Sequence, residues 1–145
     1  MKFWDSSAIV PLLIQEENSD YCLQVLADDP KMLIWCLSHV EVISAQCRSV
    51  RDGLMNADEF RKAKERLSSI VSKADEVTAI VRVRSRALRL LEVHPLRAAD
   101  ACQLAAALVG SREDPERFTI ICFDLRLQSA ASKEGFMVNP QRQIK

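Results

Sequence analysis

Short apolar segments that stop at an acidic residue limit the possible folds of this chain more than any other feature. The segment "KFW" runs into Asp5, and "RFTIICF" runs into Asp124. A third segment, "KMLIWCLS", follows two aspartates and a proline. Continuous apolar runs of this length are typical of strands that are buried on both faces of a parallel sheet. We therefore expect strands at 2–4, 31–38 and 117–124, and a last short strand in "GFMVNP" at 135–140.

The segments between these strands carry apolar residues at helical spacing. Helices are expected at 7–13, 19–27, 39–49, 56–74, 78–92 and 98–109, although the first residues of the fifth segment alternate as in a strand. Ser6 and Ser7 are the expected capping residues of the first helix. The sequence contains three glycines, a low number that also favours helix. Alternating strands and helices predict an α/β fold around a mostly parallel sheet.

Composition limits the class of protein. With 145 residues and 48% hydrophobic residues, the chain can bury the core of one domain, which we expect to span residues 1–145. The formal net charge is zero, so bulk charge gives no sign of nucleic-acid binding. Five cysteines without a C-x-x-C pair argue against a disulfide framework and a zinc knuckle, and no apolar run reaches the length of a membrane-spanning helix. These features predict a cytoplasmic protein without a membrane partner.

Four acidic residues interrupt the apolar pattern. Asp5 and Asp124 follow strands, Glu41 lies in "LSHVEVISA", and Asp100 lies in "LRAADACQLAAAL". In a parallel α/β sheet, strand ends and the starts of the following helices share one edge, so these four carboxylates can converge. Clustered carboxylates repel each other, and a hard divalent cation offsets that repulsion. The sequence thus predicts a Mg²⁺ or Mn²⁺ site that activates water to attack a phosphodiester, as in a nuclease.

Four motifs resemble those of a known family. "WDSSAIV", "SHVEVISA", "HPLRAADACQLAAAL" and "IICFDLRLQSAASKEGFMV" look like the acidic motifs of PIN-domain ribonucleases, in particular the VapC-type toxins of bacterial and archaeal toxin–antitoxin pairs. The resemblance runs from Lys2 to Val138. Two departures stand out: Cys122 replaces a frequent Thr or Ser, and Cys102-Gln103 replace a frequent aliphatic residue and His. Neither departure removes a carboxylate.

The resemblance implies a PIN-like, three-layer α/β/α sandwich and a Mg²⁺-dependent endoribonuclease. It implies that all four acids are catalytic, that Asp5, Asp100 and Asp124 bind the metal (Mg²⁺ or Mn²⁺), and that Ser7 supports Asp5 by a hydrogen bond. The implied partners are an RNA substrate, a cognate antitoxin protein and a second copy of the chain in a homodimer. For the homodimer, apolar residues of the first half offer a surface: Leu23, Val25, Leu26, Val40, Val42 and Ile43.

Basic residues concentrate in the middle of the chain, and two other functions stay open. Arg82, Arg86 and Arg89 share one side of a predicted helix, where they can contact RNA phosphates or form a solvated face.

A non-catalytic PIN-like module that binds RNA or protein is the first alternative to a nuclease, although such a module is expected to lack one or more acids. A phosphatase with Asp5 as nucleophile is the second, but such sites usually carry another acid two residues later, where Ser7 stands.

Overall fold

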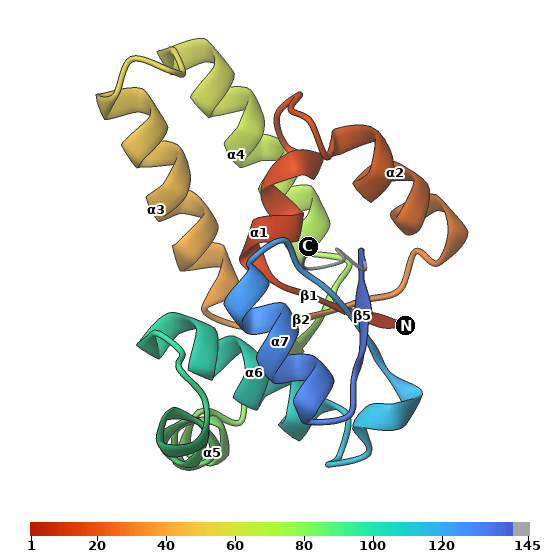
Figure 1. Ribbon diagram of the computed structural model, residues 1–145. Helices are drawn as coiled ribbons and strands as arrows, with labels where there is room; N and C mark the ends of the chain where they lie inside the picture. The colour runs from red at the N-terminus through yellow and green to blue at the C-terminus, as the bar shows by residue number, and fades with distance from the viewer. Residues whose placement is uncertain (141–145) are drawn as a thin grey trace.

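Five parallel strands form the centre of the molecule, which we describe from a computed structural model over residues 1–140. The sheet order is β3-β2-β1-β4-β5, so the first strand of the chain is the middle strand of the sheet. The strands are β1 (Lys2–Trp4), β2 (Met32–Trp35), β3 (Asp75–Val77), β4 (Thr119–Ile121) and β5 (Met137–Asn139). The predicted α/β class is confirmed, and the sheet is wholly parallel (Figure 1).

Seven α-helices and two 3₁₀ turns connect the strands within these residues. They are α1 (Ser6–Ile9), η1 (Val10–Leu12), α2 (Ser19–Asp28), α3 (Ser38–Arg51), α4 (Ala57–Val71), α5 (Ile80–Val93), α6 (Ala98–Gly110), η2 (Pro115–Arg117) and α7 (Leu125–Lys133). Each predicted helix has a counterpart, although the first is shorter and continues into η1. No helix of residues 1–140 is long and apolar enough to cross a membrane.

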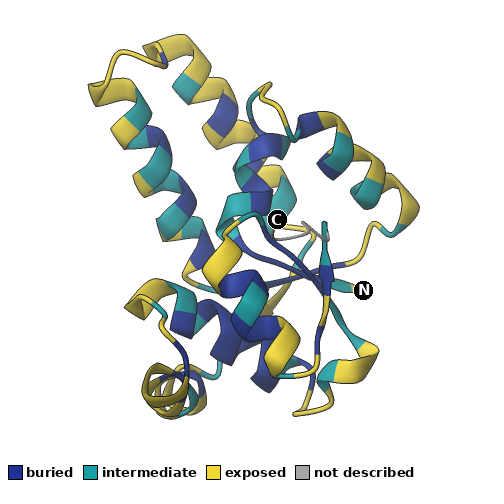
Figure 2. Cartoon of the chain, in the orientation of Figure 1, coloured by how far each residue is buried: buried dark blue, intermediate teal, exposed yellow. Residues whose placement is uncertain are grey.

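The helices cover both faces of the sheet, which gives three layers. Successive strand residues point to opposite faces: Phe3 packs in one apolar cluster, while its neighbour Trp4 packs in the other. One cluster joins the sheet to α5, α6 and α7, and the other joins it to α1, α2, α3 and α4. Figure 1 shows these helix groups on either side of the strands, and Figure 2 shows that α6 is buried along most of its length. The expected α/β/α sandwich is therefore confirmed.

Two elements, β3 and α7, were not predicted, and one local expectation was wrong. The strand β3 was not predicted, because Asp75 and Glu76 are exposed at the edge of the sheet and break the apolar pattern. The start of α1 is capped by the side chain of Asp5, which accepts a hydrogen bond from the backbone N–H of Ser7, rather than by Ser6 or Ser7. An acid that follows a strand thus also fixes where the next helix begins.

The apolar residues that suggested self-association are only partly exposed. Val42 is fully buried, and Val25, Leu26 and Ile43 pack against the core cluster of α1–α4. Leu23 and Val40 remain 50% and 64% exposed. The surface available on these helices is smaller than the sequence suggested, and the homodimer stays a prediction.

Candidate active site

Two of the four acids lie at the carboxyl ends of neighbouring strands. Asp5 directly follows β1, and its backbone N–H donates to the carbonyl of Ile121 at the end of β4 (3.0 Å). Asp124 follows β4 and caps α7 by accepting a hydrogen bond from the N–H of Leu127 at its Oδ1 (2.8 Å). Because β1 and β4 are paired in parallel, the two acids reach the same edge of the sheet.

The other two acids lie in the first turns of helices. Glu41 is in the first turn of α3, which follows β2, and Asp100 is in the first turn of α6. Asp5 is buried at 5% exposure, Glu41 and Asp100 are half-buried, and Asp124 is exposed. Asp5 is therefore the most buried of the four acids and Asp124 the most exposed, although both lie at the same edge of the sheet.

All four acids line one pocket of about 490 Å³. The other lining residues are Ser6, Ser7, Val10, Val40, Val42, Ser44, Ala45, Arg48 and Ala99. The prediction that the four acids share one cleft is confirmed, while their catalytic and metal-binding roles stay predictions. Arg48, which the sequence analysis did not identify, is exposed on α3 and has no ion pair among residues 1–140.

Burial and mutual repulsion raise the pKa of two of these acids. Burial raises the pKa of Asp5 to about 6, against the opposing effect of hydrogen bonds from Ser7, and the charges of Glu41 and Asp100 raise it further. Burial also raises the pKa of Asp100, followed by the charges of Asp124 and Glu41, while Arg97 lowers it. The four carboxylates therefore act on one another electrostatically, as a cluster in one pocket must.

Two consecutive serines each hold one acid. Ser7 Oγ donates to Asp5 Oδ2 (2.5 Å) and accepts from the N–H of Phe123 (2.9 Å). The predicted hydrogen bond from Ser7 to Asp5 is thus present, and it also ties Asp5 to the segment before Asp124. Ser6 Oγ donates to Glu41 Oε2 (2.7 Å). The "DSS" sequence therefore supplies one acid and a hydroxyl donor for each of two acids.

A buried glutamine of α6 completes this arrangement. Gln103 is 1% exposed, and its Nε2 donates to Ser6 Oγ (2.7 Å), Ser38 Oγ (3.0 Å) and Glu41 Oε2 (3.1 Å). The sequence marked this position only as a departure from the family pattern. An uncharged glutamine does not stand out in a helix as an acid does. Its role becomes visible only from the packing of α1, α3 and α6 against one another.

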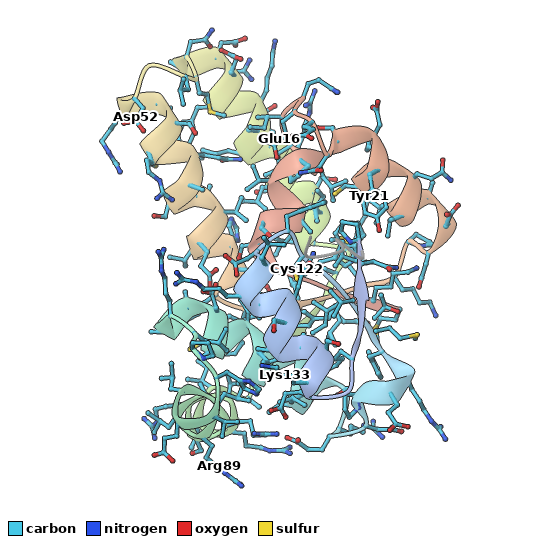
Figure 3. The ribbon with its side chains drawn as sticks, in the orientation of Figure 1. Glu16, Tyr21, Asp52, Arg89, Cys122 and Lys133 are labelled. Carbon is cyan, nitrogen blue, oxygen red and sulfur yellow. The ribbon has the colours of Figure 1, made fainter. Side chains whose placement is uncertain are left out.

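The arginines of α5 lie elsewhere. Arg82, Arg86 and Arg89 line a different pocket, whose lining includes none of the four acids. Arg86 is held by two acids from other elements, at 3.4 Å from Glu113 and 3.3 Å from Glu134. Figure 3 shows Arg89 pointing outward from α5, away from Cys122 and the start of α7. The structure does not bring these arginines to the acidic pocket, so their contact with RNA stays a prediction.

The donors of the pocket suit a hard divalent cation. They are carboxylate oxygens, and burial, with a smaller contribution from repulsion among the acids, raises the pKa of Asp5 and Asp100, an effect that a bound cation would oppose. Among residues 1–140, however, no three His, Cys, Asp or Glu side chains are grouped closely enough to hold a metal ion as they stand. Asp5, Glu41 and Asp124 are each hydrogen-bonded to neighbouring protein groups instead. Sharing an ion would require these side chains to turn towards one another.

The chain as a whole is similar to known proteins. No protein-family model matches the chain. Two curated proteins of Mycobacterium tuberculosis, Ribonuclease VapC45 (strain CDC 1551 / Oshkosh) and Ribonuclease VapC49 (strain ATCC 25618 / H37Rv), are each 28% identical to it over 138 residues. That alignment covers 95% of this chain and 94% of either relative.

Solved structures share the architecture. FitAcB from Neisseria gonorrhoeae superposes with a TM-score of 0.66 at 17% identity, covering 95% of this chain and 96% of that one. PAE2754 from Pyrobaculum aerophilum gives 0.62 at 19% identity, covering 94% and 82%. FitAB bound to an IR36 DNA fragment gives 0.64 at 15% identity, covering 95% and 93%. The solved structures confirm the fold, and the curated relatives confirm the resemblance of the chain to the VapC-type ribonucleases.

Proposed function

We propose that this protein is a divalent-metal-dependent endoribonuclease that hydrolyses RNA phosphodiester bonds, and that it is the toxin of a toxin–antitoxin pair. One observation carries the proposal: acids from four separate elements meet in one pocket next to an exposed arginine. The names of the curated relatives, both VapC ribonucleases, support it. All four acids are present, which argues against a module that only binds RNA.

Three of the acids are suited to hold Mg²⁺ or Mn²⁺. Asp5, Asp100 and Asp124 line the pocket and offer carboxylate oxygens to it, from a buried, a half-buried and an exposed position. When bound, the ion supplies an activated water and polarises the phosphodiester. Ser7 holds Oδ2 of Asp5, and the N–H of Leu127 holds Oδ1 of Asp124, so these two side chains would reach the ion by turning or through their other oxygen.

Glu41 has a different role in this proposal. Its Oε2 accepts hydrogen bonds from Ser6 and Gln103, and neither of these bonds uses Oε1. We assign Oε1 as the acceptor for the proton of the attacking water, since a general base must be ionised and held in place. This separates Glu41, as a base, from the three acids that hold the ion.

RNA needs a cation beside this acidic pocket. Arg48 lines the pocket two helical turns after Glu41 on the same helix, and it is exposed. Its guanidinium is suited to bind a phosphate next to the cleaved one, because Arg pairs with phosphate through two parallel hydrogen bonds. We place the RNA backbone across this end of the pocket rather than along α5.

A cognate antitoxin and a second copy of the chain are the proposed protein partners, as the resemblance implies. The cytoplasm is the proposed location, because an intracellular RNA is the substrate and all five cysteines are free. Purification of the protein together with the product of a neighbouring reading frame tests the antitoxin.

A cleavage assay tests the activity. The purified protein should cut RNA in Mg²⁺ or Mn²⁺ and stop when EDTA is added. Asp100→Asn should abolish cleavage, while Asp52→Asn, which changes an exposed acid at the end of α3, should not. RNA binding without cleavage would favour a binding module, cleavage in EDTA would exclude the metal mechanism, and turnover of a phosphomonoester alone would favour the phosphatase.

A further inference from the structure

The amide of Gln103 is the only buried side chain among residues 1–140 that donates hydrogen bonds to Ser6, Ser38 and Glu41 together. These three residues come from α1 and α3, while Gln103 comes from α6. Ser6 Oγ in turn donates a hydrogen bond to Glu41 Oε2. The network therefore starts at one amide group and ends on one carboxylate oxygen.

The charge of Glu41 fixes the direction of this amide. An ionised carboxylate only accepts hydrogen bonds, so the Ser6 hydroxyl must be the donor in its bond to Glu41. A hydroxyl has one proton to donate, so Ser6 Oγ must be the acceptor in its bond to Gln103. If the amide were turned over, its oxygen would face the carboxylate oxygen of Glu41. Nε2 must point towards Glu41.

The protein bears a cost for this orientation. Gln103 Oε1 is buried and has no hydrogen-bond partner among residues 1–140. A buried acceptor without a partner is unfavourable, and the residues that follow Gln103 in α6 are apolar and buried. The other end of the amide is the donor to Ser6, Ser38 and Glu41, so the unpaired oxygen accompanies a donor aimed at Glu41, which points to a role for that donor.

We propose that Gln103 is the positioning residue for Glu41. Its amide, acting directly and through Ser6, holds Oε2 so that Oε1 faces the water that attacks the RNA. This inference rests on the proposed nuclease function and on the assignment of Glu41 as its base. Gln103 itself does not contact the reacting atoms.

Two substitutions test the need for a donor. Gln103→Met keeps the length of the side chain and removes the donor, and it should lower kcat about 10–100-fold, the usual effect of losing such a supporting hydrogen bond. The KM for RNA should not change, because the phosphate contacts are untouched. Gln103→His restores one N–H donor and should recover most of the lost rate. An unchanged kcat in Gln103→Met, or no recovery in Gln103→His when it folds normally, would overturn the proposal.

A matched control separates positioning from folding. Gln46 is also a buried amide, on α3, and neither of its polar side-chain atoms has a hydrogen-bond partner among residues 1–140. Gln46→Met should therefore leave kcat unchanged. Melting curves in EDTA give the folded fraction of each variant. If the loss of activity in Gln103→Met matched its loss of folded protein, Gln103 would be structural only.

A measurement without substrate keeps the two proposals distinct. In the ¹⁵N-labelled protein, Glu41→Gln should shift the side-chain amide resonances of Gln103, and Ser6→Ala should shift them too, because both are acceptors of its hydrogen bonds. The amide resonances of Gln46 should stay in place. Unshifted Gln103 resonances would overturn the network even if the wild type cleaves RNA. Shifted resonances in a protein that cleaves no RNA would refute the nuclease function alone.

Discussion

Replacing Asp5 by asparagine should make the metal-free protein more stable at neutral pH. Burial, with a smaller contribution from the charges of Glu41 and Asp100, raises the pKa of Asp5 to about 6 despite its hydrogen bonds from Ser7. A carboxyl group in the unfolded chain has a pKa of about 3.9, so the shift of about two units corresponds to roughly 3 kcal/mol against folding when Asp5 is ionised. Because the fold disfavours the charged form, this cost is full above pH 6 and disappears as the pH falls from about 6 to about 4.

Asparagine removes the charge and keeps the shape. Its side-chain oxygen can still cap α1, as Asp5 does, although the hydrogen bond from Ser7 Oγ becomes weaker by about 1 kcal/mol once the acceptor is neutral. The net gain should be about 1–3 kcal/mol. For a domain of this size, each kcal/mol raises Tm by about 2–4 °C, so Tm should rise by roughly 2–12 °C.

Thermal melts in EDTA between pH 4 and pH 8 check this expectation. The variant should melt above the wild type at pH 7.5, and the difference should close near pH 4. Asp29→Asn is the control with the opposite sign, because the amino group of Met1 and then Lys2 lower the pKa of Asp29 to about 2. Losing this partly exposed ion pair should lower the free energy of unfolding by up to about 1 kcal/mol. An Asp5→Asn variant that melts below the wild type at pH 7.5 would refute the reasoning.

Three further expectations can be checked separately. Arg48→Gln should raise the KM for RNA and weaken its salt dependence at unchanged kcat, while Arg51→Gln, on the same helix outside the pocket, should do neither. Gln46→Leu should raise the free energy of unfolding by about 1–2 kcal/mol, and with it Tm, because it removes a buried amide without hydrogen-bond partners. A lower Tm would contradict this. Light scattering should show a dimer, and Leu23→Lys with Val40→Lys should convert it to a monomer if those exposed side chains lie in the interface.

The fold was predictable where apolar pattern and burial agree. The strands β1, β2 and β4 are apolar because helices cover both faces of the sheet, and this pattern is visible in the sequence. The strand β3 was not predicted because it lies at the edge of the sheet, where backbone pairing matters more than apolar side chains. Asp75 and Glu76 pair with β2 through the backbone while their side chains remain exposed. A purely local pattern cannot reveal a pairing with a strand forty residues away.

The site was predictable to the extent that charge stands out. Each of the four acids breaks an apolar segment, and that break is visible without a structure. Gln103 and Ser6 carry no charge, so their hydrogen bonds to Glu41 depend on the packing of three helices. Arg86 was misleading in the opposite way. Its charge stands out in the sequence, but it forms ion pairs with Glu113 and Glu134, which are distant in the chain.

The position of β1 in the sheet bears on the order in which the pocket is completed during synthesis. β1 is made well before its neighbour β4 and the acid that follows β4. Until Asp124 has emerged, the pocket lacks one wall, and β1 has an unpaired edge on that side. On the proposed nuclease function, a nascent chain that stops before Asp124 therefore has no complete site, and the messenger RNA being translated is not exposed to its activity. On the proposed toxin function, a truncation before β4 should be harmless to the cell that makes it.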